Sequence, residues 1–140
     1  MKTHRSTPIK VATSLVLGFL FIFLLHTVGE IEYRFEDASF TVHTSVWSDK
    51  TVAYEEIERI ERRESFDAGQ RTNGFGSSKL SAGRFRNREF GAYQLYAYSA
   101  SEIVVVLHLQ DGSILVLTGG DNAATEELYS RLENRACSVQ

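Results

Sequence analysis

The chain has 140 residues, of which 43% are hydrophobic, and its formal net charge is −3 at pH 7. This length suits one small globular domain with a modest additional element and is too short for two ordinary domains. The acidic balance argues against a nucleic-acid-binding protein, which would normally be strongly basic in order to displace counterions from phosphates. Cys137 is the single cysteine, which excludes an internal disulfide framework and a metal site made of several thiolates.

Residues 11–28 read VATSLVLGFLFIFLLHTV, with no formal charge if His26 is neutral. As a helix, this segment would be about 27 Å long, enough to cross a thin bilayer core. It is also apolar around its whole circumference, which a domain of this size could hardly bury. We therefore expect a cytoplasmic tail over residues 1–10 and a transmembrane signal-anchor helix over residues 11–28.

A cleaved signal peptide is the alternative, because Lys2, Arg5 and Lys10 precede the apolar run. The run is long for such a peptide, and Thr27 and Gly29 match an A-x-A cleavage site poorly, so the sequence favours an uncleaved anchor. Acidic residues dominate after the run, and the positive-inside rule then places the N-terminus in the cytoplasm. The predicted localisation is the cell membrane, single-pass, with the following domain outside the cytoplasm.

Alternating apolar and polar side chains predict β-strands after this segment. Residues 31–35 alternate, and residues 40–46 continue the pattern beyond a turn at Asp37, so these two stretches should pair antiparallel. Residues 51–65, TVAYEEIERIERRES, suggest a strand, a short turn and a second strand. Residues 92–99, AYQLYAYS, alternate again and predict a further strand.

Two apolar runs, Ile103 to Leu109 and Ile114 to Leu117, flank Asp111-Gly112. Asp-Gly favours the positive φ angles of a type I′ turn, so the runs should form a hairpin. Both runs are apolar on both faces, which predicts a position at the centre of the fold with a cover on each side.

Residues 121–135 predict one amphipathic C-terminal helix, with Asp121 or Asn122 as its N-cap. One narrow apolar stripe repeats every four residues and can lie on the sheet. The stripe consists of Ala124, Leu128 and Leu132.

The order of these elements, together with a run of glycines and apolar positions, resembles the bacterial pleckstrin-homology (PH) domain families of small membrane proteins. The residues that carry the resemblance are Arg71, Gly74, Gly76, Gly83, Phe85, Gly91, Tyr96, Asp111 and Gly112, with VAYEEIERI upstream. The resemblance covers roughly residues 31–133. Gly119-Gly120 stands where such families often have a proline before the last helix, and Leu128 stands for a phenylalanine within it.

The resemblance implies a fold that is mainly β with one C-terminal α-helix. We expect a PH-like barrel or sandwich of about seven antiparallel strands over residues 30–136. It also implies a membrane-tethered, non-catalytic interaction module without a defined ligand. We expect this module to act as a protein-interaction or scaffold module with a protein partner, and the acidic balance argues against nucleic acid.

The Gly-rich stretch over residues 71–91 raises the question of phosphate binding. GFGSSK at residues 74–79 lacks the spacing of a Walker A loop and the helix behind it, so the sequence argues against nucleotide binding. An anionic ligand or lipid head group remains the alternative function, and its candidate residues are Arg71, Lys79, Arg84, Arg86 and Arg88.

Arg84, Arg86 and Arg88 alternate, so on a strand they would share one face. The sequence favours a simpler interpretation, in which this face is solvated and its charges keep a sheet edge from pairing with other chains. With the domain outside the cytoplasm, cytoplasmic anionic lipids would also be out of reach. We interpret the whole stretch as a hairpin connection and a strand, with positive φ at some glycines.

No pattern in the chain predicts catalysis. The histidines His4, His26, His43 and His108 lack metal-ligand spacing, and no nucleophile-elbow motif occurs. We therefore expect no enzyme activity, catalytic residue, metal or cofactor, and an unrecognised enzyme is the least favoured alternative function. An aromatic group should mostly fill the interior, with a peptide-binding surface as the alternative. Its members are Phe85, Phe90, Tyr93, Tyr96 and Tyr98.

Overall fold

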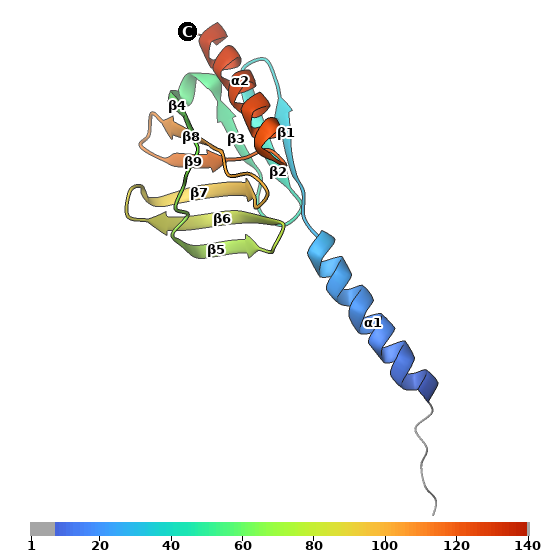
Figure 1. The fold of residues 1–140 in the computed structure, drawn as a ribbon. Helices are drawn as coiled ribbons and strands as arrows, with labels where there is room; N and C mark the ends of the chain where they lie inside the picture. Colours follow the sequence, from blue (N-terminus) through green and yellow to red (C-terminus); the bar gives the residue numbers. More distant parts are fainter. Residues whose placement is uncertain (1–7, 140) are drawn as a thin grey trace, which may run out of the picture.

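The computed structural model describes residues 8–139. Helix α1 (Pro8–Thr27) projects away from a β-rich unit that ends in helix α2 (Asn122–Val139), as Figure 1 shows. Most of the predicted N-terminal tail, residues 1–7, lies outside the described residues.

The predicted transmembrane anchor is wrong, because no helix within residues 8–139 is both long enough and apolar enough to cross a membrane. The prediction counted every residue from Val11 to Val28 toward the span. Helix α1 ends at Thr27, and the polar residues Thr13 and Ser14 interrupt its apolar sequence. The single-pass localisation and the orientation deduced from that span are corrected with it.

Three antiparallel strands form the smaller sheet, in the order β1-β2-β3. They are β1 (Ile31–Phe35), β2 (Ser39–Thr44) and β3 (Lys50–Ala53), and a short 3₁₀ turn at Tyr54–Glu56 leads out of β3. This confirms both the predicted first hairpin and the predicted strand, turn and strand. Alternation places Phe40, Val42 and Val52 on one face, where all three are fully buried.

Six strands form the larger sheet, in the order β4-β8-β9-β7-β6-β5. The strands are β4 (Ile57–Arg63), β5 (Gln70–Gly76), β6 (Leu80–Asn87), β7 (Gly91–Tyr98), β8 (Val104–Leu109) and β9 (Ile114–Leu117). The mainly β fold with a C-terminal helix is thus confirmed, but within residues 8–139 it is an open sandwich of nine strands, not a closed barrel of about seven. The β7–β9 pair is parallel, because the β8–β9 hairpin inserts between β4 and β7.

The central hairpin pairs β8 with β9 as predicted, but its turn is not type I′. Leu109 N–H donates to Ser113 O at 2.9 Å, which closes a three-residue loop. Only Gly112 has positive φ there, at 84°, whereas a type I′ turn needs two such residues. The Asp111 carboxylate accepts bonds from the Ser113 N–H and hydroxyl and thereby stabilises this longer loop.

The central strands of the larger sheet, β8 and β9, are covered on both faces, as their apolar pattern predicted. Its inner face packs against the smaller sheet and α2 through residues such as Leu107 and Leu115. The connection from β4 to β5, residues 64–69, crosses the outer face and closes a second core around Val106 and Val116 (Figure 1).

Helix α2 closes the inner core. Asp121 is its N-cap, since its Oδ1 accepts a bond from Ala124 N–H at 2.8 Å. The buried stripe is Thr125, Leu128, Leu132 and Ala136. Ala124, which the apolar pattern selected, is exposed. Thr125 replaces it because its hydroxyl bonds to Asp121 O at 2.7 Å and accepts from Gly119 N–H at 2.9 Å.

Candidate anion-binding site

The Gly-rich stretch forms a two-stranded hairpin, β5 and β6, with a turn at residues 77–79. Gly74 and Gly83 face each other across the pair and have φ angles of 123° and 151°. A Cβ on Gly74 would collide with the Ala82 carbonyl, and one on Gly83 with the Asn73 carbonyl. The glycines therefore serve the close approach of two strands.

Strand β6 directs Arg84 and Arg86 to the inner face of the larger sheet. Its pairing with β7 is unbroken along its whole length, so side chains alternate strictly between faces. Leu80 and Ala82 share the face of the arginines and are buried under the smaller sheet. The two arginines lie further along the same face and are exposed, so this part of the sheet is not covered.

A cavity of about 410 Å³ opens beside Arg84. Lys50 at the start of β3 lines it from the smaller sheet, while Gln94 lines it from β7. Arg86 lies next to the cavity, since it pairs with the lining residue Ala92. The remaining lining residues are Thr72, Tyr93, Asp111, Ser113 and Ile114.

The cations of this region lack carboxylate partners. Within residues 8–139, no ion pair involves Lys50, Arg84 or Arg86. Asp111 is the one carboxylate that lines the cavity. Hydrogen bonds from Ser113 lower the pKa of Asp111, and the charge of Lys50 lowers it further, so Asp111 stays ionised and partly offsets Lys50.

The other predicted site residues lie elsewhere. Arg71 pairs opposite Phe85 on the outer face, and its guanidinium lies over Gly76. Lys79 Nζ donates to Gly29 O at 2.9 Å, at the opposite end of β6. Arg88 is exposed in the turn after β6 and not on the strand. The structure therefore brings Arg84 and Arg86 together and adds Lys50 and Gln94, whose positions depend on how the sheets pack and carry no local sequence signal.

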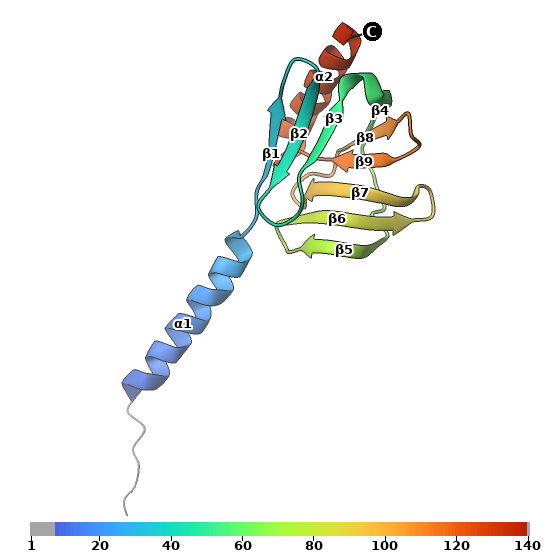
Figure 2. The same cartoon turned by 180° about the vertical axis from the view of Figure 1, so that it is seen from behind.

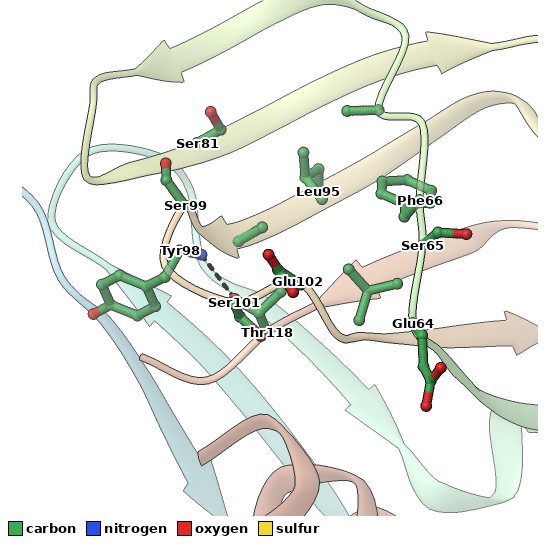
Figure 3. A pocket seen from close by; sticks show the side chains of 13 residues that line it. Glu64, Ser65, Phe66, Ser81, Leu95, Tyr98, Ser99, Ser101, Glu102 and Thr118 are labelled. Carbon is green, nitrogen blue, oxygen red and sulfur yellow. Dashed lines mark hydrogen bonds between the residues drawn. The ribbon is translucent and has the colours of Figure 1, made fainter. Parts of the chain in front are cut away.

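A second cavity, of about 450 Å³, lies on the outer face between the β4–β5 connection and the β7–β8 loop. Figure 3 shows hydroxyl groups and two carboxylates, Glu64 and Glu102, around a floor that includes Leu95. Tyr98 N–H donates to Thr118 Oγ1 at 2.7 Å at its edge. None of the five predicted site residues lines this cavity, and its carboxylates would repel an anion.

The two histidines in the β-rich unit are separate from each other and from Arg84 and Arg86, although His108 Nε2 lies 3.1 Å from Arg59 Nη2. His43 Nδ1 lies 2.8 Å from Asp49 Oδ1, and His108 Nε2 lies 3.5 Å from Glu61 Oε1. Residues 8–139 hold no group of three or more side chains suited to a metal ion. His4 lies outside the described residues.

The aromatic group selected from the sequence packs on both sides of the larger sheet. Phe85, Phe90 and Tyr93 belong to the outer core, where Tyr93 OH donates to Ala68 O at 2.6 Å. Tyr96 is fully buried in the inner core, and its burial raises its pKa to about 12. These rings fill the two cores.

Comparison with known families identifies the class of the β-rich unit. A family model described as a bacterial PH domain matches residues 31–135, from the first residue of β1 into the last turns of α2. The chain belongs to the bacterial PH domain family. No curated protein and no solved structure matches the chain. PH domains are generally non-catalytic interaction modules, and helix α1 lies outside the matched part of this one.

Proposed function

We propose that this bacterial PH domain binds an anionic group, such as a phosphate, at Arg84 and Arg86 with Lys50 facing them. The observation that carries the proposal is that Arg84 and Arg86 form no ion pair within residues 8–139 and adjoin a cavity of about 410 Å³ that Lys50 also lines. The chain as a whole has a formal net charge of −3, so these cations form a local positive region, and a cleft lined by one sign of charge attracts counter-ions.

The chemistry of the site fits phosphate. Two residues apart on one strand, Arg84 and Arg86 have Cα atoms about 6.6 Å apart, so two guanidinium groups can reach one phosphate or a pair of linked phosphates. Guanidinium donors bind phosphate oxygens in bidentate geometry. Gln94 adds a neutral donor at the cavity wall. Asp111 opposes the anion and limits its affinity.

The test is a titration of the full-length chain with inorganic phosphate and with pyrophosphate, in which isothermal calorimetry measures the heat of binding. We expect R84S/R86S to weaken binding by about tenfold or more, because two charge-assisted contacts are lost. R71S is the matched control: it removes one arginine from the opposite face of the same hairpin and should leave binding unchanged. D111N should tighten binding by a few fold.

Vesicles distinguish a lipid head group from a free phosphate. Any contribution from the exposed apolar side chains of α1 is common to vesicles of phosphatidylcholine alone and vesicles that also contain phosphatidylglycerol. Binding that requires phosphatidylglycerol and is lost in R84S/R86S would identify a lipid head group as the source of the anion. Equal affinity of wild-type chain and R84S/R86S for every probe would refute the proposed site.

A protein partner is the second candidate ligand of this interaction module. The observation in its favour is the position of β1 at the edge of the smaller sheet, beside α2 but hydrogen-bonded to one strand only. An open edge can accept a further strand from another chain.

A further inference from the structure

The hydrogen bonds of the β1–β2 hairpin determine which backbone N–H and C=O groups of β1 point away from β2, toward the free edge of the sheet. Glu36 N–H donates to Ser39 O at 2.9 Å, which makes this a hydrogen-bonded pair. Hydrogen-bonded and non-hydrogen-bonded pairs alternate along an antiparallel ladder. The N–H and C=O groups of Ile31, Tyr33 and Phe35 therefore point away from β2. The bond from Ile31 N–H to Tyr98 Oη at 2.8 Å, outside the sheet, agrees with this phase.

The edge is closed at Ile31 and open beyond it. No hydrogen bond from another element reaches the backbone of Tyr33 or Phe35 within the described part of the chain. A groove of about 370 Å³ separates β1 from α2, with Leu128 on its floor. Helix α2 also contacts the strand directly, since Arg131 Cζ lies 4.4 Å from the centroid of the Phe35 ring. This contact involves side chains and leaves the outward backbone groups of Tyr33 and Phe35 without a hydrogen bond from α2 in the described part of the chain. Figure 2 shows β1 as the outermost strand of the smaller sheet.

The charge pattern of β1 indicates what covers this edge. Glu32 and Arg34 are exposed and point to the same face, where Arg34 Nη2 lies 3.1 Å from Glu32 Oε2. A second β1 in antiparallel pairing centred on Tyr33 would place Glu32 opposite Arg34 of the partner subunit, twice by symmetry. Centring on Glu32 would oppose two glutamates, and centring on Arg34 would oppose two arginines. Opposite charges across a strand pair stabilise it and like charges destabilise it.

We propose that two copies of the chain associate through β1, antiparallel and centred on Tyr33. The backbone phase fits this register, because the outward groups of Tyr33 meet those of Tyr33 of the partner subunit. Ile31 N–H stays bonded to Tyr98, whereas Ile31 O accepts only a long bond of 3.4 Å from Tyr98 Oη and has a second lone pair for Phe35 N–H of the partner subunit. The two smaller sheets then form one six-stranded sheet. Glu30 and Glu36 face each other at its ends, outside β1, where solvent screens their repulsion.

This association is independent of the anion site. Arg84 and Arg86 lie on β6 in the other sheet, whereas β1 contacts that sheet mainly near Tyr98 of β7. A chain that loses either property can therefore keep the other.

Charge exchange tests the register with matched variants of the full-length chain. Sedimentation velocity should show dimers for the wild-type chain and at least about tenfold weaker association for E32R and for R34E, since each opposes like charges across the two-fold axis. The double variant E32R/R34E should associate like the wild-type chain. Circular dichroism should show the same fold for all four chains.

The decisive measurement mixes E32R with R34E. Neither chain can form its internal Glu32–Arg34 pair, yet a mixed dimer brings two arginines opposite two glutamates. We expect mixed dimers in native mass spectrometry where each variant alone is monomeric. A wild-type chain that is monomeric, or single variants that associate as well as the wild-type chain, would overturn the proposal. Association that persists in every variant would assign self-contact to another surface, such as α1, and would also overturn it.

Discussion

Two groups of arginines on the larger sheet differ in how their charge is balanced. On β4, Arg62 Nε donates to Glu126 of α2 at 2.7 Å, and Arg63 Nη1 donates to Glu89 in the β6–β7 turn at 2.6 Å. On β6, Arg84 and Arg86 have no such partner within residues 8–139. The same residue type therefore joins parts of the fold in one strand and remains available to a ligand in the other.

The comparison shows that local charge density alone does not reveal a binding site. Residues 58–64 hold three arginines, as many as residues 84–88. Three glutamates lie among them in the sequence ERIERRE, and each of the three arginines forms an ion pair with one of these glutamates. What separates the groups is the position of carboxylates in space. The proposed binding role of Arg84 and Arg86 depends on the absence of an acid within ion-pair distance in the described residues.

The largest effect on stability should come from a change that disrupts the β5–β6 hairpin, which carries Arg84 and Arg86. Gly74→Ala would place a Cβ against the Ala82 carbonyl at a φ of 123°, which alanine rarely adopts. We expect a loss of about 2–4 kcal/mol in the free energy of unfolding, measured by urea denaturation. Gly120→Ala is the control, because nothing lies within 4 Å of its added Cβ. Equal stability of the two variants would contradict the tight approach of β5 and β6.

A smaller effect on stability should distinguish the ion-paired arginines of β4 from the unpaired arginines of β6. Arg63 contacts Glu61 and Glu89 and lies over the Phe90 ring, with 5.1 Å from its Cζ to the ring centroid. Arg63→Ala should lower the free energy of unfolding by about 1–2 kcal/mol. Arg86→Ala should change it by less than about 0.5 kcal/mol. Thermal denaturation of both variants checks this difference, and a larger loss for Arg86→Ala would mean that Arg86 has a structural partner.

The smallest effect should be on the stability of the fold at acid pH, through Glu61 of β4. Burial raises the pKa of Glu61, but the hydrogen bond from Arg63 and the charges of Arg63 and Arg59 outweigh burial and hold the pKa below its usual value of 4.5. The ion pairs of Glu61 therefore stabilise the fold fully above about pH 4.5, and this contribution is lost as the pH falls through the lower folded-state pKa.

Glu61→Gln should reduce the loss of stability between neutral pH and acid pH, as measured by denaturant titrations at a series of pH values. The exposed neighbour Glu58→Gln is the matched control on the same strand. An identical acid profile for wild-type chain and Glu61→Gln would mean that the β4 ion pairs contribute nothing to folding.

Local patterns predicted most of the strands, because side-chain alternation and turn residues act over a few positions. The faces of the basic residues could not be predicted so simply. A β-bulge between Arg71 and Asn73 makes Thr72 an extra residue and shifts the alternation along β5. Lys50 reaches the site across two sheets, which no spacing in the sequence encodes.

Two further differences have the same kind of cause. The helix stripe was read from apolar residues alone, so it included Ala124 and missed Thr125, whose hydroxyl is satisfied by Asp121 O. The membrane prediction relied on the count of apolar residues in one segment, whereas the structure ends that helix at Thr27. Whether a polar side chain finds a hydrogen-bond partner, and where a helix ends, depends on the three-dimensional arrangement of the chain and cannot be read from its composition.

The junction ahead of β1 has a mechanical consequence. Gly29 is buried with a φ of 102°, a Cβ there would come within 3.2 Å of Leu80, and its carbonyl accepts the bond from Lys79. The segment that enters the domain is thus held at Gly29 by a hydrogen bond from Lys79 and by packing against Leu80, the first residue of β6. A force applied to this segment would therefore act first on the β5–β6 turn and on the first residue of β6, at the end of the strand that is far from Arg84 and Arg86.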